Sequence, residues 1–320
     1  MGSRVVEVAV PGVAGRRLSM HLHESHDQYI SEEIAGNGIW ETLETTIILR
    51  LLQPGELLVD CGANIGWYSM MAAAMGAHVM AFEPEPGNLA LLKANIGANS
   101  LDGFVEIYGV ALGRRAGTST LQLSAFNQGD HRVSAVPVGE TVTIGVEVLD
   151  DKLGSRTPTV IKLDTQGSEV AILRGATATL SGDRVGDVSL VIEYWPYGLQ
   201  DCGASAEELI GLLTPIVGVS HDCFDLDESR GVLRPITLVE LARKAASGAY
   251  SPAGQGHTNL LVLPKHRRES FDDLLAPEPV ADESEPVAAE RAPHAASSPV
   301  EADRNWLDRL RRRFSGDTSR

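Results

Sequence analysis

A short glycine-containing turn after an apolar run constrains the fold of this chain more than any other feature. Leu57-Leu58-Val59 has the length and composition of a buried strand, and it leads directly into Asp60-Cys61-Gly62-Ala63-Asn64-Ile65-Gly66. A helix pattern follows, from Trp67 to Met75. A strand, a glycine turn and a helix in this order are typical of an α/β domain whose helix N-terminus faces a nucleotide-like ligand.

The same alternation of strand and helix continues along the chain. Further strands are expected at 78–82, 104–110, 159–163, 188–194, 216–224 and 259–263, and helices at 39–52, 88–96, 168–180 and 204–213. Two alternating β-branched runs, at 118–123 and 142–148, interrupt this rhythm. The pattern predicts a mostly parallel sheet with helices on both faces and a β-rich insertion at its edge.

The chain divides into three parts by composition. Residues 1–27 are expected to be an N-terminal edge segment with a short strand at Val5–Val10, and residues 28–265 the main domain. Residues 266–320 are expected to be a disordered tail, because Ala, Pro, Glu and Ser dominate from Ala276 to Ala302. An Arg-rich helix at Glu301–Phe314 fits either a fraying end or a contact with a partner or an acidic membrane surface.

Charge and cysteine content indicate which substrates and which cellular compartment to expect. The formal net charge is −16 over 320 residues, so a nucleic-acid substrate is not expected. No apolar run is long enough for a transmembrane segment, and the first residues do not resemble a signal peptide. Cys61, Cys202 and Cys223 have no metal-ligand spacing. We therefore expect a reduced, cytoplasmic protein.

The glycine turn differs from a dinucleotide-binding motif. A G-x-G-x-x-G pattern starting at Gly62 would need glycines at the positions of Asn64 and Trp67. The spacing D-x-G-x-x-x-G suits a ligand without a pyrophosphate, and Asp60 provides an acid for a methionyl amino group. Glu83 ends the next strand roughly twenty residues later, where an acid accepts ribose hydroxyls.

A second polar cluster follows a central strand, in Lys162-Leu163-Asp164-Thr165-Gln166-Gly167-Ser168-Glu169. Ligands bind at the carboxyl ends of such strands, so Asp164 is a candidate for catalysis or substrate contact. The alternative is that Asp164 and Ser168 only cap the next helix. Capping does not account for Gln166 and Glu169 in the same cluster.

Five segments in order, DCGANIGWYS, AFEPEPGNLALLKANI, GVALG, VIKLDTQGSEVAILRGA and LVIEYW, closely resemble the FkbM-type methyltransferase family. The resemblance covers roughly residues 28–264. It implies a Rossmann-like class I methyltransferase fold with a seven-stranded sheet, and S-adenosyl-L-methionine as the methyl donor. It also implies O-methylation of a hydroxyl on a sugar, glycan or secondary metabolite.

The resemblance also implies roles for individual residues. The methionine end of the donor would be lined by Asp60, Gly62, Asn64 and Gly66. Glu83 would hold the ribose, and Val110 and Ala111 would lie near the adenine. The transferred methyl would face Asp164, Gln166 and Glu169. Many family members carry Glu where this chain has Gln166, so another residue must serve as base if that acid does so elsewhere.

An alcohol acceptor must lose its proton as the methyl group is transferred, so a base is expected. Asp164 is the first candidate and His131, in the insertion loop, is the second; the alternative for His131 is an exposed loop histidine.

Glu193 is expected to contact substrate. A metal shared by Asp164 and Glu193 has little support, and no metal is expected. His21, His23 and His26 fit no standard metal spacing.

Other functions fit the sequence less well. A non-catalytic S-adenosyl-L-methionine-binding module would share the same donor site. A nicotinamide-dependent oxidoreductase conflicts with the missing glycines, and a nucleic-acid methyltransferase conflicts with the charge and lacks an N/D-P-P-Y motif. Acceptor contacts are expected from the loops at Ser124–Val138 and Pro196–Leu238. Their composition does not identify the acceptor.

Overall fold

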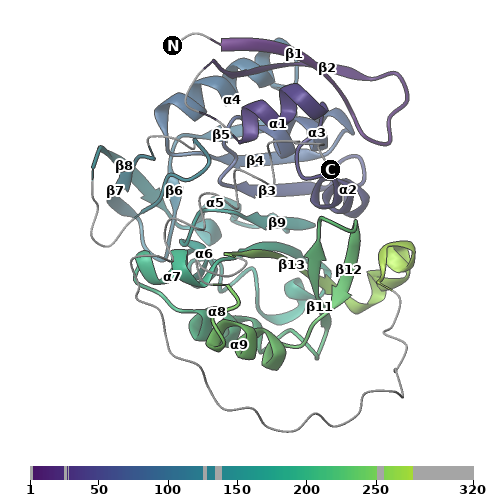
Figure 1. The fold of residues 1–320 in the computed structure, drawn as a ribbon, viewed down its shortest axis with the longest axis vertical. Helices are drawn as coiled ribbons and strands as arrows, with labels where there is room; N and C mark the ends of the chain where they lie inside the picture. The colour runs from purple at the N-terminus through teal and green to yellow at the C-terminus, as the bar shows by residue number, and fades with distance from the viewer. Residues whose placement is uncertain are drawn as a thin grey trace, which may run out of the picture.

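The computed structural model describes residues 3–24, 27, 29–124, 128–133, 139–250 and 256–276 (Figure 1). In this part of the chain the central sheet has eight strands in the order β12-β11-β13-β10-β9-β3-β4-β5. Their bounds are β3 Leu57–Cys61, β4 His78–Phe82, β5 Val105–Tyr108, β9 Val160–Leu163, β10 Ser189–Tyr194, β11 His221–Asp227, β12 Val232–Pro235 and β13 Thr258–Pro264.

The strand directions confirm the predicted fold class. Strands β5, β4, β3, β9 and β10 are parallel neighbours, and β13 runs antiparallel between β10 and β11. Strand β12, which pairs antiparallel with β11, is one more than the seven strands predicted. It is short and ends in Pro235, so its sequence carries little strand signal. The first strand, β3, lies between β4 and β9, the switch point where α/β sheets bind ligands.

Helices cover both faces of the sheet, with one apolar core on each face. The first core includes residues of α2 Thr42–Leu51, α3 Trp67–Ala74 and α4 Pro86–Ala98. The second includes residues of α5 Leu149–Leu153, α6 Glu169–Arg174, α7 Pro196–Asp201, α8 Ala206–Leu213 and α9 Leu238–Ala246. A 3-10 turn, η1 Gly182–Asp187, precedes β10. Because both faces are covered, β3 and β9 are buried along their whole length.

The predicted β-rich insertion is confirmed as a separate three-stranded sheet of β6 Ala111–Leu112, β7 Gly117–Gln122 and β8 Thr141–Glu147. The strand expected over 104–110 ends at Tyr108, because the chain then leaves the main sheet for β6. The helix expected over 168–180 ends at Arg174. Gly175 follows, and a Cβ atom there would lie 2.3 Å from the carbonyl oxygen of Gly113.

The N-terminal segment differs from the edge strand that the sequence predicted. β1 Ser3–Ala9 pairs with β2 Arg17–His23 in a two-stranded antiparallel sheet of its own, and α1 Ile30–Asn37 follows. This hairpin packs on α4, where the side-chain oxygens of Asn95 and Asn99 accept hydrogen bonds from the β2 backbone. The segment is therefore attached to a helix and does not extend the main sheet.

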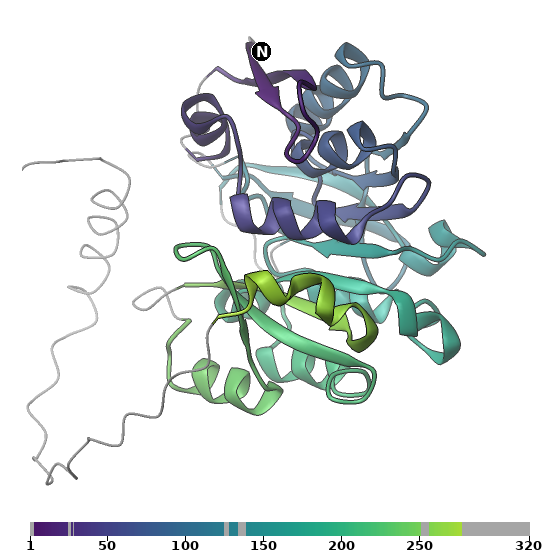
Figure 2. The ribbon, with the colours of Figure 1, turned by 90° about the vertical axis from the view of Figure 1, so that its right-hand side faces the viewer.

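The C-terminal part of the domain extends further than expected. Residues 266–274, assigned to the tail from composition, belong to a 3-10 helix, η2 Lys265–Leu274. Figure 2 shows η2 in yellow-green next to α2, where Arg50 makes two hydrogen bonds to Asp273, of 2.6 and 2.8 Å. Phe271 is buried, which anchors η2 despite its charged sequence. The proposed helix at 301–314 lies outside the described residues.

None of the helices described is long and apolar enough to span a bilayer.

Candidate active site

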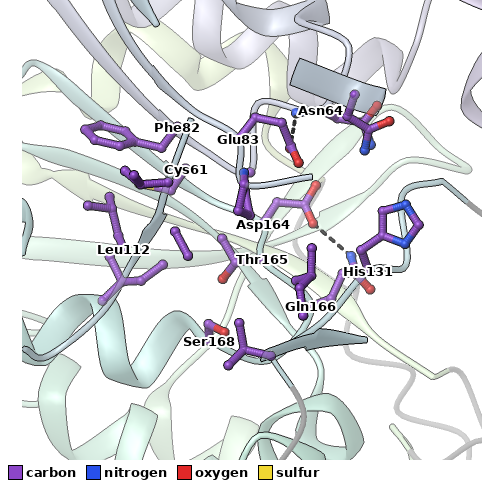
Figure 3. A pocket seen from close by; sticks show the side chains of 18 of the residues that line it. Cys61, Asn64, Phe82, Glu83, Leu112, His131, Asp164, Thr165, Gln166 and Ser168 are labelled. Carbon is purple, nitrogen blue, oxygen red and sulfur yellow. Dashed lines mark hydrogen bonds between the residues drawn. The ribbon is translucent and has the colours of Figure 1, made fainter. Parts of the chain in front are cut away.

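A cavity opens at the carboxyl ends of β3, β4 and β9, and most of the predicted site residues line it (Figure 3). The predicted residues among its lining are Gly62, Asn64, Glu83, Val110, Ala111, His131, Asp164 and Gln166. Figure 3 shows Glu83, Asp164 and His131 entering the cavity from three different segments. The parallel sheet brings the first two together because neighbouring strands end at the same edge.

The glycine turn after β3 makes close backbone contacts with the ends of β4 and β9. The backbone N–H groups of Gly62 and Ala63 both donate to the carbonyl oxygen of Phe82, at 3.0 Å. Gly62 has φ +83°, and a Cβ atom on it would lie 1.9 Å from the carbonyl oxygen of Asp164. Only glycine fits this close approach, which leaves the turn's backbone open to a ligand.

Asp60 lies beneath this turn and is fully buried. Its Oδ2 accepts a hydrogen bond of 2.6 Å from the Ser69 hydroxyl, whereas its Oδ1 has no hydrogen-bond partner among the described residues. Burial raises the pKa of Asp60, and the nearby charge of Lys162 opposes that rise. A buried carboxylate oxygen without a donor costs free energy, so Asp60 is suited to accept from a ligand.

Glu83 is held in a fixed orientation by two backbone donors. Its Oε2 accepts from the N–H of Asn64 and its Oε1 from the N–H of Glu85, both at 2.8 Å. Asn64 adopts a left-handed backbone conformation, with φ +50°, that turns this N–H toward Glu83. Burial raises the pKa of Glu83 to about 8, although the two hydrogen bonds lower it.

Asp164 follows β9 and points one carboxylate oxygen at each of two donors. Its Oδ2 accepts from Lys162 Nζ at 2.8 Å and its Oδ1 from Gln166 Nε2 at 2.9 Å. Burial alone would raise its pKa, but the charge and hydrogen bond of Lys162, with the hydrogen bond of Gln166, hold the pKa of Asp164 below its usual value. Asp164 is therefore ionised at neutral pH.

Lys162 is buried in a group of acids that sequence reasoning missed. Its Nζ lies 3.7 Å from Glu44 Oε1 and 4.6 Å from the centre of the Tyr68 ring, and the Tyr68 hydroxyl donates to Glu41 at 2.6 Å. Burial raises the pKa of Glu41 to about 7 and that of Glu44 well above its usual value. Glu44 shares the buried face of α2 with Ile47, Ile48 and Leu51. This pattern was a signal in the sequence, because an acid on an apolar helix face needs a partner.

Gln166 connects Asp164 to Glu193. Its Nε2 also donates to Glu193 Oε1 at 3.2 Å, and its backbone is left-handed with φ +57°. Burial and the charge of Asp164 raise the pKa of Glu193 well above its usual value. Glu193 lies behind Gln166 and is not part of the cavity lining. Among the described residues, no three His, Cys, Asp or Glu side chains are arranged to hold a metal ion.

The structure does not bring the Glu169 side chain to the cavity, although the sequence led us to expect it near the transferred methyl. Its side chain turns back into the preceding turn, where Oε1 accepts from the N–H and the hydroxyl of Thr165 at 2.9 and 2.8 Å and from the N–H of Gly167 at 3.2 Å. The residue is fully buried and does not line the cavity. Glu169 thus stabilises the turn that carries Gln166.

His131 lines the cavity, but both of its ring nitrogens are engaged. Nδ1 accepts from the N–H of Ser124 at 3.0 Å, which places the ring proton on Nε2, 3.1 Å from Gln128 Oε1. Burial lowers the pKa of His131, so the ring is neutral. In this arrangement it has no free lone pair with which to take a proton from an acceptor. It is neither an exposed loop histidine nor a ready base.

The loop of residues 128–133 is held beside the cavity by contacts at both of its ends. The carbonyl oxygen of Gln128 accepts from Asn64 Nδ2 at 3.1 Å and from Asn88 Nδ2 at 2.9 Å. At the other end, the Arg132 guanidinium lies 4.7 Å from the centre of the Trp195 ring and 3.4 Å from Asp201. This is the described part of the expected acceptor loop at 124–138; residues 125–127 and 134–138 lie outside the described residues.

His257 is a second residue that sequence reasoning missed. It directly precedes β13, and because β13 is antiparallel, its first residue pairs with Tyr194 at the carboxyl end of β10. His257 therefore lies at the same sheet edge as Asp164, and its charge contributes to lowering the pKa of Asp164. The sequence did not reveal the direction of β13, and a parallel strand would put His257 at the opposite edge of the sheet.

Part of the chain around this cavity matches a known domain family. Residues 60–213 match the family model of the methyltransferase FkbM domain. The matched segment contains Asp60, Glu83 and Asp164, whereas Glu44 and His257 lie outside it.

Individual proteins match this chain at 30% identity or less. The hexuronic acid methyltransferase AglP of Haloferax volcanii is 30% identical over 141 residues, which are 43% of this chain and 58% of that protein. The chain thus spans little more than half the length of this relative. Among solved structures, a methyltransferase FkbM from Methylobacillus flagellatus is 20% identical with a TM-score of 0.40, covering 66% of this chain and 44% of that one. A putative methyltransferase of Streptococcus mutans, in complex with SAH, is 8% identical with a TM-score of 0.40, covering 70% and 96%.

Proposed function

We propose that this protein is an S-adenosyl-L-methionine-dependent O-methyltransferase that acts on a hydroxyl of a sugar, glycan or secondary metabolite. One observation carries the proposal: Glu83 and Asp164 follow the two strands that flank β3 and line one cavity, and Asp60 is buried in β3 between them. Each acid has a different environment, and each environment suits a different part of the donor.

The residues present fit the donor. The unpartnered Oδ1 of Asp60 suits the ammonium of the methionyl group. The oxygens of Glu83 each use one lone pair on a backbone N–H and keep another for a ribose hydroxyl. Val110 and Ala111 offer an apolar edge to the adenine. When bound, the donor supplies a methyl group already activated on a sulfonium.

The chain's own contribution to the reaction is then alignment and removal of a proton. Asp164 lines the cavity, its side chain is 33% exposed, and Lys162 keeps it ionised. It can accept the proton of an acceptor hydroxyl while the new carbon–oxygen bond forms. The pKa of Glu193 is raised well above its usual value and both nitrogens of His131 are engaged, so Asp164 is the base that we favour among the residues predicted from sequence.

A sugar acceptor is supported by the similarity to AglP, a hexuronic acid methyltransferase. The test is transfer of a labelled methyl group from S-adenosyl-L-methionine to a panel of glycosides, glycans and hydroxylated metabolites, with Asp164→Asn as the control. We expect labelled product from the wild type and at least a hundredfold slower transfer by the variant. The product should be a methyl ether that survives alkali, whereas an alkali-labile ester would show that a carboxyl group is the acceptor. Donor binding without transfer to any acceptor would favour a non-catalytic binding module.

A further inference from the structure

The charges on the cavity wall are unevenly distributed. Among the described residues that line the cavity, Glu83 and Asp164 are the acids, and there is no lysine or arginine. The counter-ion of Asp164 approaches from behind: Lys162 Nζ lies 2.8 Å from Asp164 Oδ2, but the Lys162 side chain is only 2% exposed. A ligand in the cavity therefore meets the carboxylate and not the ammonium.

The two acids differ in their charge at neutral pH. Burial raises the pKa of Glu83 to about 8, so at pH 7 it is mostly protonated. Lys162 and Gln166 hold the pKa of Asp164 low, so its negative charge persists. The permanent negative charge on the described cavity wall at neutral pH is thus that of Asp164.

Asp164 also lies beside the path between the two ends of the donor site. Its carbonyl oxygen is against Gly62, in the turn that covers Asp60. Asp60 and Glu83 are the proposed contacts of the amino and ribose groups, and the sulfur of the donor joins those two parts. The product differs from the donor only at sulfur, which has lost its methyl group. The donor's sulfur is a cation, and the product's sulfur is a neutral thioether.

We propose that Asp164, with Lys162 as its buried counter-ion, makes this cavity select the sulfonium donor over its thioether product. This inference rests on the proposed function, because it assumes that the cavity is the donor site. Lys162 is then a positioning residue: it keeps Asp164 charged and orients it without touching the ligand. Loss of the sulfonium charge on methyl transfer removes this attraction, which favours release of the product.

Calorimetric titration with S-adenosyl-L-methionine and S-adenosyl-L-homocysteine tests the inference without an acceptor. We expect the wild type to bind the sulfonium about tenfold more tightly than the thioether. In Asp164→Asn this ratio should fall to about one, mainly through loss of affinity for the sulfonium. Glu193→Gln is the matched control: it replaces a carboxyl that does not line the cavity by an amide of similar size, so the ratio should stay at the wild-type value.

A second measurement uses only the wild type, so it can be made even if the Asp164→Asn variant does not fold. An analogue with a primary ammonium on carbon in place of the methylsulfonium keeps the positive charge and should bind more tightly than the thioether. Equal binding of this analogue and the thioether to the wild type would overturn the inference, as would an unchanged ratio in folded Asp164→Asn. If folded wild type binds none of these ligands, the proposed function fails instead.

Discussion

Gly62 lies against the backbone of Asp164 so closely that a Cβ atom on Gly62 would be 1.9 Å from the carbonyl oxygen of Asp164. This contact joins the turn after β3 to the turn after β9. The first turn covers Asp60, and the second carries the acid proposed as base. The absence of a side chain at position 62 therefore sets the spacing between the proposed donor and methyl-transfer parts of the site.

Gly62→Ala should disrupt this spacing. The added Cβ would overlap a backbone oxygen, and φ +83° is unfavourable for alanine, so we expect the free energy of unfolding to fall by about 3 kcal/mol or more. Chemical denaturation measures it. Gly97→Ala is the control: Gly97 is in helix α4 with nothing within 4 Å of an added Cβ, and the change should stabilise by roughly 0.5–1 kcal/mol. Equal effects of the two changes would refute this explanation.

Gln166→Glu should make stability depend on pH. The new carboxyl would replace a donor that lies 2.9 Å from Asp164 and 3.2 Å from Glu193, so three acids would meet. Folding would then raise the pKa of the acids, and stability would fall as pH rises above their unfolded values of about 4. We expect a loss of about 1–3 kcal/mol at pH 8 and a smaller loss at pH 5, measured by urea unfolding at both. Gln53→Glu, at an exposed position, should change stability by less than about 0.5 kcal/mol, and a similar loss there would contradict the argument.

Donor affinity should rise with pH through the ionisation of Glu83. Its pKa is about 8, and the ribose hydroxyls of the proposed donor would donate to its ionised form. At pH below 8 the group must first lose a proton, so affinity should fall by up to about tenfold per pH unit. Calorimetry between pH 6 and 9 measures this trend. Glu83→Gln should bind more weakly and lack the Glu83-dependent part of the trend; the same pH dependence in both proteins would exclude Glu83 as its source.

Asn88→Ala should loosen the loop over the cavity. The Asn88 amide donates to the carbonyl oxygen of Gln128 at 2.9 Å, and its loss leaves Asn64 as the remaining side-chain donor to that oxygen in the described structure. We expect the donor to dissociate several-fold faster in stopped-flow experiments. Asn99→Ala removes two hydrogen bonds between Asn99, which follows α4, and the backbone of Ser19 in β2; this change is away from the cavity and should leave dissociation unchanged. No difference between the two variants would show that this contact does not restrain the loop.

The sequence predicted the parts of the site that depend on local order. Asp60, Gly62, Glu83 and Asp164 each end or follow a strand, and neighbouring parallel strands must end at one edge. The chain's own pattern of strands and turns was therefore sufficient to bring them together, as the cavity lining confirms for Gly62, Glu83 and Asp164.

Other parts depend on packing between distant segments and could not be predicted in this way. Glu44 comes from a helix more than a hundred residues before Lys162, and the position of His257 depends on the reversed direction of β13. The error over Glu169 is of another kind. Sequence spacing places it near the cavity, but its rotamer turns it into the backbone of Thr165 and Gly167.

Calorimetric titration of S-adenosyl-L-methionine into the wild type and Glu83→Ala, at pH 8, tests the central claim most directly. The account predicts binding by the wild type with a dissociation constant in the micromolar range, and at least tenfold weaker binding by the folded variant. A folded wild type that releases no binding heat, and that is not stabilised by the donor in thermal unfolding, would contradict the claim that this cavity holds the methyl donor.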